Sequence, residues 1–131
     1  MLIAILQFDL LIHGSTSLKD KRRVVSSVKD RLHREHMAAV AEIGSLESHS
    51  VARLGLALVG SDEKYLAQTL DRIALKLRAL HDAELGDCRR DIIAGREPDE
   101  MDPVEIDLPD PFLAQELLRH ADSTNSDHKA P

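Results

Sequence analysis

The chain has 131 residues and a formal net charge of −6, a length that favours one domain with a modest core. Its single cysteine, Cys88, excludes an internal disulfide, which suits a reducing compartment. No segment has the pattern of a signal peptide or a membrane span, so we expect a cytoplasmic protein without membrane contact.

The first predicted element is a strand over residues 2–12. Its even positions are all apolar, whereas Gln7 and Asp9 interrupt the apolar residues at the odd positions. This period of two is typical of a sheet that has one face fully covered by the core. A polar loop over residues 13–16 follows the strand.

The next element is a basic helix from residue 18 to about residue 36. Ser17 and Asp20 resemble a capping box, in which the hydroxyl accepts from a backbone N–H and the carboxylate reaches back. Apolar residues at positions 18, 25, 28 and 32 form one stripe. Elsewhere the helix is basic, with seven Lys or Arg against three acids between residues 19 and 35.

The basic residues crowd the first turn of this helix, where the helix dipole is positive. Cations there are unfavourable by about 0.3–1 kcal/mol each, and a bound anion would reverse that penalty. We therefore expect a phosphate or carboxylate site, with a nucleic-acid backbone as its best match, and the alternative is a solvated basic face. The predicted contact residues are Ser15, Ser17, Lys19, Lys21, Arg22, Arg23, Lys29 and Arg31.

A β-hairpin is predicted next, with strands over residues 38–47 and 51–60 and a turn at residues 48–50. A second helix begins after Ser61 and Asp62, and its apolar residues recur at steps of four and three as far as Leu80. Residues 84–93 are predicted to form the last strand. The charged residues of that segment favour an edge position in the sheet.

The order β-α-β-β-α-β predicts an α+β, ferredoxin-like sandwich over residues 1–93. Right-handed crossovers place both helices on one face of a four-stranded antiparallel sheet whose first and third strands are central. The other face of the sheet is then open, and Ile3, Ile5, Ala57 and Val59 are predicted to lie on it. An exposed apolar patch of this kind usually marks an interface, and either sheet-to-sheet dimerisation or docking of residues 112–118 would cover it.

Residues 94–131 differ in composition from the rest of the chain. Residues 97–110 contain seven acids, no bases and three prolines, which is typical of a linker or a disordered arm. We predict an acidic, partly disordered C-terminal extension. Within it, Asp110 and Pro111 would begin a short helix over residues 111–121.

Four motifs of the chain resemble those of the YlxP-like family, a group of small bacterial proteins of unassigned function. They are Asp9-Leu10-Leu11-Ile12, Ser17-Leu18-Lys19-x-Lys21-Arg22, Val40-Ala41-Glu42 and Leu54-Gly55-x-Ala57-x-Val59. The resemblance spans about residues 1–93 and implies a ferredoxin-like fold. It also implies an association with translation and ribosome maturation, because genes of the family often lie among translation genes. Two features depart from the family pattern: His13 stands where a proline is usual, and the central hairpin lacks an aromatic residue.

The sequence contains no known catalytic motif, and only His33 and His36 have a spacing suited to a metal. We therefore predict no catalytic residue, no metal and no cofactor. Stacking of nucleobases on the open sheet face is disfavoured, because Phe8 is expected in the core and Tyr65 on a helix.

Two functional hypotheses follow from these observations. In the first, a non-enzymatic protein contacts structured RNA or the ribosome through its basic helix, with ribosomal RNA or a ribosomal subunit as partner. Its contacts would reach the RNA backbone without distinguishing sequence. In the alternative, the protein is a homodimeric interaction module that uses the open sheet face and has no nucleic-acid role. An enzyme with an anionic small-molecule substrate is a third interpretation.

Overall fold

The computed structural model describes residues 1–107 and 110–128, with side chains of the last helix described as far as residue 121. The chain divides into two compact units, Met1–Pro98 and Asp99–Pro131. The first unit has the predicted α+β, ferredoxin-like order of elements. These are β1 (Leu2–Leu11), α1 (Leu18–His36), β2 (Ala39–Gly44), β3 (Val51–Gly60), α2 (Glu63–Arg78) and β4 (Glu84–Ala94).

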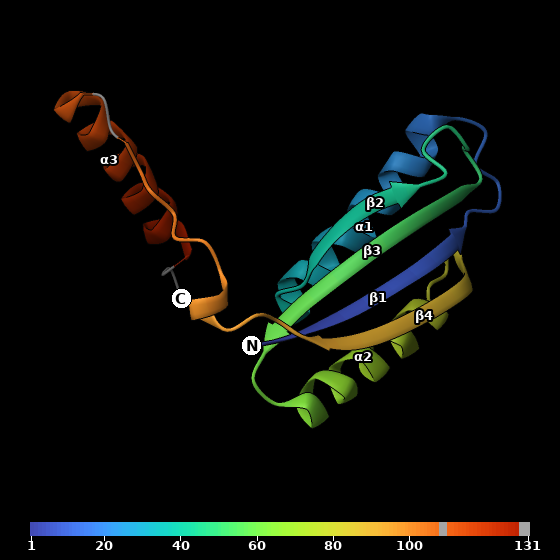
Figure 1. The fold of residues 1–131 in the computed structure, drawn as a ribbon. Helices are drawn as coiled ribbons and strands as arrows, with labels where there is room; N and C mark the ends of the chain where they lie inside the picture. Colours follow the sequence, from blue (N-terminus) through green and yellow to red (C-terminus); the bar gives the residue numbers. More distant parts are fainter. Residues whose placement is uncertain (108–109, 129–131) are drawn as a thin grey trace. The chain divides into compact units, whose positions relative to one another are not determined.

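The four strands form one antiparallel sheet in the order β2-β3-β1-β4. The predicted central pair is confirmed, since β1 pairs with β3 along its full length, from Leu2 opposite Gly60 to Leu11 opposite Val51. Both helices cover the same face of the sheet (Figure 1). The opposite face carries no helix of this unit.

The core lies between the sheet and the two helices. Phe8 and its neighbours at even positions of β1 are buried, as the period of two predicts. Each fully buried Leu, Ile or Phe contributes about 1.5–3 kcal/mol relative to an exposed one. The helices contribute Val25, Val28 and Leu32 from α1, and Leu66, Leu70, Ile73 and Leu77 from α2.

Local capping interactions define the ends of both helices. The Asp62 carboxylate accepts hydrogen bonds from the backbone N–H of Lys64 at 3.0 Å and of Tyr65 at 3.3 Å, which begins α2. At the C-terminus of α1, Met37 adopts a left-handed conformation with φ of 56°. Its N–H donates to the carbonyl of His33 at 2.8 Å and closes the helix.

Strand β2 is shorter than the predicted strand over residues 38–47, because the chain leaves the sheet after Gly44. Ser45 has a φ of 57°, and the N–H of Ser48 donates to the carbonyl of Ser45 at 3.1 Å to close a turn. The carbonyls of Ser45 and Ser48 both accept from the ammonium group of Lys21 on α1. Residues 45–48 thus form a turn outside the strand that Lys21, from a distant part of the sequence, holds through hydrogen bonds.

The second unit contains α3 (Pro111–His128), which extends past the predicted helix over residues 111–121. Asp110 begins this helix, and its carboxylate accepts from the N–H of Phe112 at 3.0 Å. Phe112, Leu113 and Leu117 are exposed on α3. Residues 108–109 and 129–131, which belong to the predicted extension, lie outside the described residues. In the part of the chain that is described, no helix combines the length and apolar character needed to cross a bilayer.

Candidate functional site

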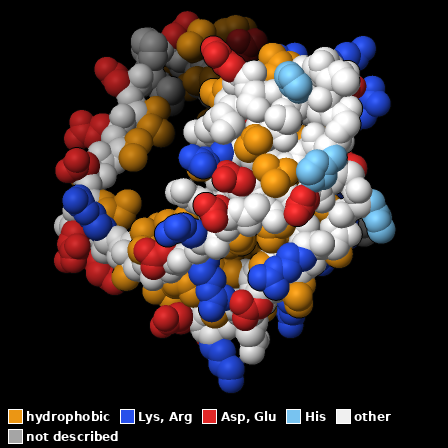
Figure 2. Space-filling view, turned by 90° about the vertical axis from the view of Figure 1, so that its right-hand side faces the viewer, with side chains coloured by type: hydrophobic (Ala, Val, Ile, Leu, Met, Phe, Trp, Pro, Cys, Tyr) orange, Lys and Arg blue, Asp and Glu red, His pale blue; other side chains and the backbone are white. Residues whose placement is uncertain are grey.

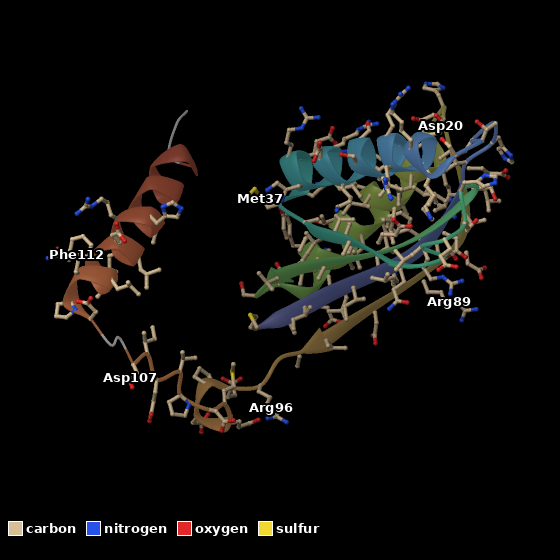
Figure 3. All side chains as sticks on the ribbon, turned by 90° about the horizontal axis from the view of Figure 1, so that it is seen from above. Asp20, Met37, Arg89, Arg96, Asp107 and Phe112 are labelled. Atoms are coloured by element: carbon tan, nitrogen blue, oxygen red, sulfur yellow. The ribbon has the colours of Figure 1, made fainter. Side chains whose placement is uncertain are left out.

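The loop before α1 and the first turn of that helix are joined by hydrogen bonds. The Ser17 hydroxyl accepts from the N–H of Asp20 at 3.2 Å, as the capping box predicts. The Asp20 carboxylate reaches back to Thr16, accepting from its N–H at 3.2 Å and its hydroxyl at 3.1 Å. These bonds hold the pKa of Asp20 below its ordinary value, the Thr16 N–H having the largest effect. The start of α1, labelled at Asp20 in Figure 3, is thus occupied by a carboxylate of the chain itself.

Lys21 is separated from the other predicted contact residues. Its side chain is only 2% exposed and points from α1 toward the β2–β3 turn. The ammonium donates to the carbonyls of Ser45 at 2.7 Å and Ser48 at 2.6 Å, and it lies 2.7 Å from a carboxylate oxygen of Glu42. That oxygen of Glu42 is buried, and the ion pair with Lys21 compensates its charge. Lys21 therefore has a structural contact and is not available to a ligand at the surface.

The exposed cations of α1 remain as the predicted basic surface. Lys19, Arg22 and Arg23 are exposed on its first two turns, and Lys29 is half-buried further along. Within the described residues, Lys19, Arg22 and Lys29 form no ion pair. Arg31 differs, because its guanidinium pairs with Glu35 at 3.2 Å. Among the described residues, Arg34 in the last turn is likewise exposed without an ion pair, so unpaired positive charge runs along α1 and includes its first two turns.

The β2–β3 turn lies beside the loop before α1. The sequence pattern does not predict this contact, because the two segments are far apart in the chain. A ring nitrogen of His49 lies 3.1 Å from the carbonyl of Ser15, and the Ser15 hydroxyl donates to the carbonyl of Ser17. We call the surface formed by Lys19, Arg22, Arg23, residues 15–17 and residues 45–50 the basic end. Figure 2 faces this end of the first unit, with Lys and Arg side chains projecting at its upper right and again in its lower half, and with histidines, acidic and hydrophobic side chains between them.

The open face of the sheet contains the second set of predicted residues. Ile3 pairs with Val59, and Ile5 pairs with Ala57, in neighbouring positions of β1 and β3. Val59 is 68% exposed, and the other three are half-buried. Ile93 extends the same row on β4, where it pairs with Ile3. The structure thus brings the four predicted interface residues together.

The other half of this face is polar. Arg53 donates to both carboxylate oxygens of Asp9, at 2.8 and 3.3 Å, and this pairing lowers the pKa of Asp9. Arg89 lies on the side of the sheet away from the helices (Figure 3). Gln7, Asp9, Arg53, Asp87 and Arg89 line a shallow depression here.

The acidic, histidine and cysteine side chains of the described residues lie apart from one another in the cases that the sequence singles out. No group of three or more His, Cys, Asp or Glu side chains there could hold a metal ion. Asp9 and Glu42 lie on opposite faces of the sheet, because Asp9 pairs with Arg53 and Glu42 contacts the buried Lys21. Burial raises the pKa of the Cys88 thiol, which disfavours the reactive thiolate.

Comparison with known proteins identifies one sequence family and a distant match among solved structures. The sequence model of one family, described as "Protein of unknown function (DUF503)", matches residues 3–90. No curated protein matches the chain. Among solved structures, a mutant of SnoaB, a cofactor-independent oxygenase from Streptomyces nogalater, matches with a TM-score of 0.40 and 12% identity. That match covers 73% of this chain and 94% of the SnoaB chain.

Proposed function

The chain belongs to the DUF503 family of proteins of unknown function, and for this member we propose a non-enzymatic role in binding the backbone of structured RNA. The observation that carries the proposal is the basic end, where Lys19 and Arg22 are exposed without an acidic partner among the described residues. Arg23, Lys29 and Arg31 extend the positive surface along α1. We leave Lys21 out of the binding surface because its side chain is buried.

Electrostatics supports a polyanion as the ligand of this surface. Cations near a helix N-terminus are opposed by the helix dipole, so Lys19 and Arg22 gain from a nearby negative charge. Asp20 supplies one such charge, but its carboxylate is already engaged with Thr16. Phosphates spaced along a nucleic-acid backbone would supply the remainder, and Lys and Arg bind them through charge and hydrogen bonds.

The side chains favour recognition of shape over recognition of sequence. Proteins that select unpaired RNA bases commonly stack them on exposed aromatic rings. Phe8 is buried in the core, and Tyr65 is exposed on α2, away from the basic end. A helical RNA region read through its phosphates and hydroxyl groups is therefore the best match. The hydroxyl groups of residues 15–17 already bond within the chain, so the exposed cations are the groups that would contact such a region.

The resemblance to the YlxP-like family makes this proposal more specific. It suggests ribosomal RNA or a ribosomal subunit as the partner, a role in translation or ribosome maturation, and a cytoplasmic location. The motif that carries the resemblance most strongly, Ser17-Leu18-Lys19-x-Lys21-Arg22, is also the one that forms the basic end. Residues that define the motif thus include both the proposed RNA contacts and the buried lysine that shapes their surroundings.

The experiment that tests the proposal measures binding to purified ribosomal subunits over a salt series. The test variant is Lys19→Glu/Arg22→Glu/Arg23→Glu, which alters exposed side chains only. The matched control is Lys64→Glu/Arg72→Glu/Arg78→Glu, which makes the same charge change at exposed positions of α2. Comparing the two variants separates contact at α1 from a general effect of net charge.

We expect wild-type binding that weakens as salt rises, because phosphate contacts release counterions. The α1 variant should bind roughly tenfold or more weakly, with the slope of log affinity against log salt reduced by about 2.7, at about 0.9 for each of the three lost contacts. The control should keep most of the wild-type slope. Equal losses in both variants would remove the basic end as the contact surface, and absence of wild-type binding at low salt would refute the proposal.

A further inference from the structure

The open face of the sheet carries a continuous apolar surface that no element of the first unit covers. The exposed fraction of Val59 is 68%, that of Ile43 is 48% and that of Ile93 is 41%. Ile43 lies on this face because its side chain packs beside Gly55 of β3. We call the following residues the apolar patch: Ile3, Ile5, Ala39, Ala41, Ile43, Gly55, Ala57, Val59 and Ile93.

The chemistry of the whole face limits the partner that fits it. Its side chains are aliphatic, charged or, at Gln7, polar, and none is aromatic, so stacked bases or an aromatic-lined groove have no counterpart here. The charges beside the apolar patch have both signs, with Asp9 held by Arg53 and Arg89 between Asp87 and Asp91 on β4. A strongly acidic or strongly basic partner gains little from such a surface. A second surface of the same mixed character is complementary to it.

The size of the face agrees with that partner. Four strands about 4.8 Å apart and rising about 3.3 Å per residue give a flat area of roughly 550–600 Å². Side chains that project from the sheet make its accessible surface larger than this flat area. The accessible surface then approaches the ~800 Å² that each partner buries in a stable interface of standard size. The apolar patch alone is smaller, so the occupant must extend over the whole sheet. A helix is too narrow to do so, whereas another four-stranded sheet is wide enough.

We propose that the occupant is a second copy of this chain, packed sheet against sheet as a symmetric homodimer. Face-to-face sheets pack about 10 Å apart and interdigitate aliphatic side chains, which the apolar patch supplies from both copies. Pairing through the edge of β4 is disfavoured, because that strand carries Arg89, Arg90 and Asp91. The dimer leaves both helix layers, and so both basic ends, on its outer surfaces. It does not depend on RNA binding.

The test measures the mass of the full-length protein by sedimentation equilibrium over a concentration series. Val59→Glu places a charge in the apolar patch, and Ile93→Lys does so with the opposite sign on an edge strand. Leu75→Glu is the matched control, since Leu75 is 64% exposed but lies on α2. Circular dichroism of each variant establishes that the fold is retained.

We expect wild type and Leu75→Glu to have twice the 14.6 kDa chain mass. Val59→Glu and Ile93→Lys should dissociate with a dissociation constant raised at least tenfold. Wild type that stays monomeric at every concentration would overturn the proposal. So would a dimer that both patch variants leave intact, because the interface would then lie elsewhere. If Val59→Glu fails to fold, Ile93→Lys decides the outcome alone.

Discussion

Lys21 is a charged residue within the buried stripe of α1. Its ammonium group reaches three oxygens, the carbonyls of Ser45 and Ser48 and the carboxylate of Glu42, at 2.6–2.7 Å. A buried ammonium is tolerated when it is paired and hydrogen-bonded, and here both conditions are met. The lysine thus fixes the β2–β3 turn against the start of α1. It positions the basic end without being part of its surface.

Replacing Lys21 with Met should lower the free energy of unfolding by about 3–5 kcal/mol. The substitution keeps much of the apolar stem but leaves the Glu42 carboxylate without its buried partner. Urea denaturation at pH 7, followed by circular dichroism, measures the change. Arg22→Met is the control, because Arg22 is exposed one position further along and should change stability by no more than about 0.5 kcal/mol. Equal stability of the two variants would show that Lys21 does not hold the turn.

Helical periodicity places Lys21 on the buried side of α1, whereas its charge predicts a position on the surface. Position 21 precedes the buried Val25 by four residues and Val28 by seven, so it lies on the buried stripe, whereas Leu18, which was predicted in that stripe, is 38% exposed. Its charge groups Lys21 with the other cations of α1 and predicts a surface position, and lysines are seldom fully buried. The acceptors that make burial possible lie on a turn more than twenty residues later. Local pattern contains no information about that contact.

At the scale of elements, the C-terminal end of α1 is joined to α2 through polar side chains. Lys76 of α2 contacts the carboxylate of Glu35, and its ammonium lies 2.9 Å from a ring nitrogen of His36. Because an ammonium can only donate, that nitrogen accepts and the imidazole is neutral. Burial lowers the pKa of His36, with further lowering by Lys76 and Arg72, while Glu35 acts in the opposite direction. The contact between the helices therefore depends on pH.

Stability should fall as the pH drops below about 6.5, the ordinary value for histidine. Below that pH the unfolded chain binds a proton at His36 more readily than the folded chain, so protonation favours unfolding. The loss should continue down to the lowered pKa of the folded state, at no more than about 1.4 kcal/mol per pH unit. Urea denaturation between pH 7.5 and 5 measures it. His36→Gln should show a smaller slope than wild type, and identical slopes would exclude His36 as the cause.

The elements themselves were predictable because each follows from local chemistry. The alternation in β1, the apolar steps in α2 and the caps at Ser17 and Asp62 depend on residues close in sequence. Pairing of β1 with β3 followed from the order of elements and the handedness of crossovers. The hydrogen-bond partner of Asp20 was not predictable in this way. Its carboxylate accepts from Thr16 and not from the capping residue Ser17. The end of β2 was not predictable either, because the turn that follows it is bonded to Lys21 of α1.

For the whole molecule, charge is divided unequally between the two units. Residues 1–98 have a balance of +1, and residues 99–131 have a balance of −7. The basic end therefore belongs to a unit that is nearly neutral, in a chain that is strongly acidic as a whole. The long-range field of the acidic residues repels a polyanion approaching either unit. RNA binding through α1 should then be opposed by charge alone, wherever the second unit lies.

Deleting residues 99–131 should tighten binding to ribosomal subunits at low salt, by about threefold or more. The effect should shrink between about 0.01 M and 0.15 M ionic strength, as the Debye length falls from about 30 Å to about 8 Å. A matched full-length variant replaces the seven acids of residues 97–110 with Asn or Gln. Both variants have a net charge of +1. Binding assays at the two salt concentrations compare them with wild type.

Equal tightening in the two variants would assign the effect to charge, because only one of them has lost the helix α3. Tightening in the deletion alone would instead show that the bulk of residues 99–131 obstructs the RNA. Unchanged affinity in both would mean that the acidic residues do not oppose binding at all. That last outcome contradicts a contact driven by phosphate charge, since a change of seven units in net charge must alter the approach of a polyanion at low salt. The same pair of variants therefore tests the RNA hypothesis from the acidic side of the molecule.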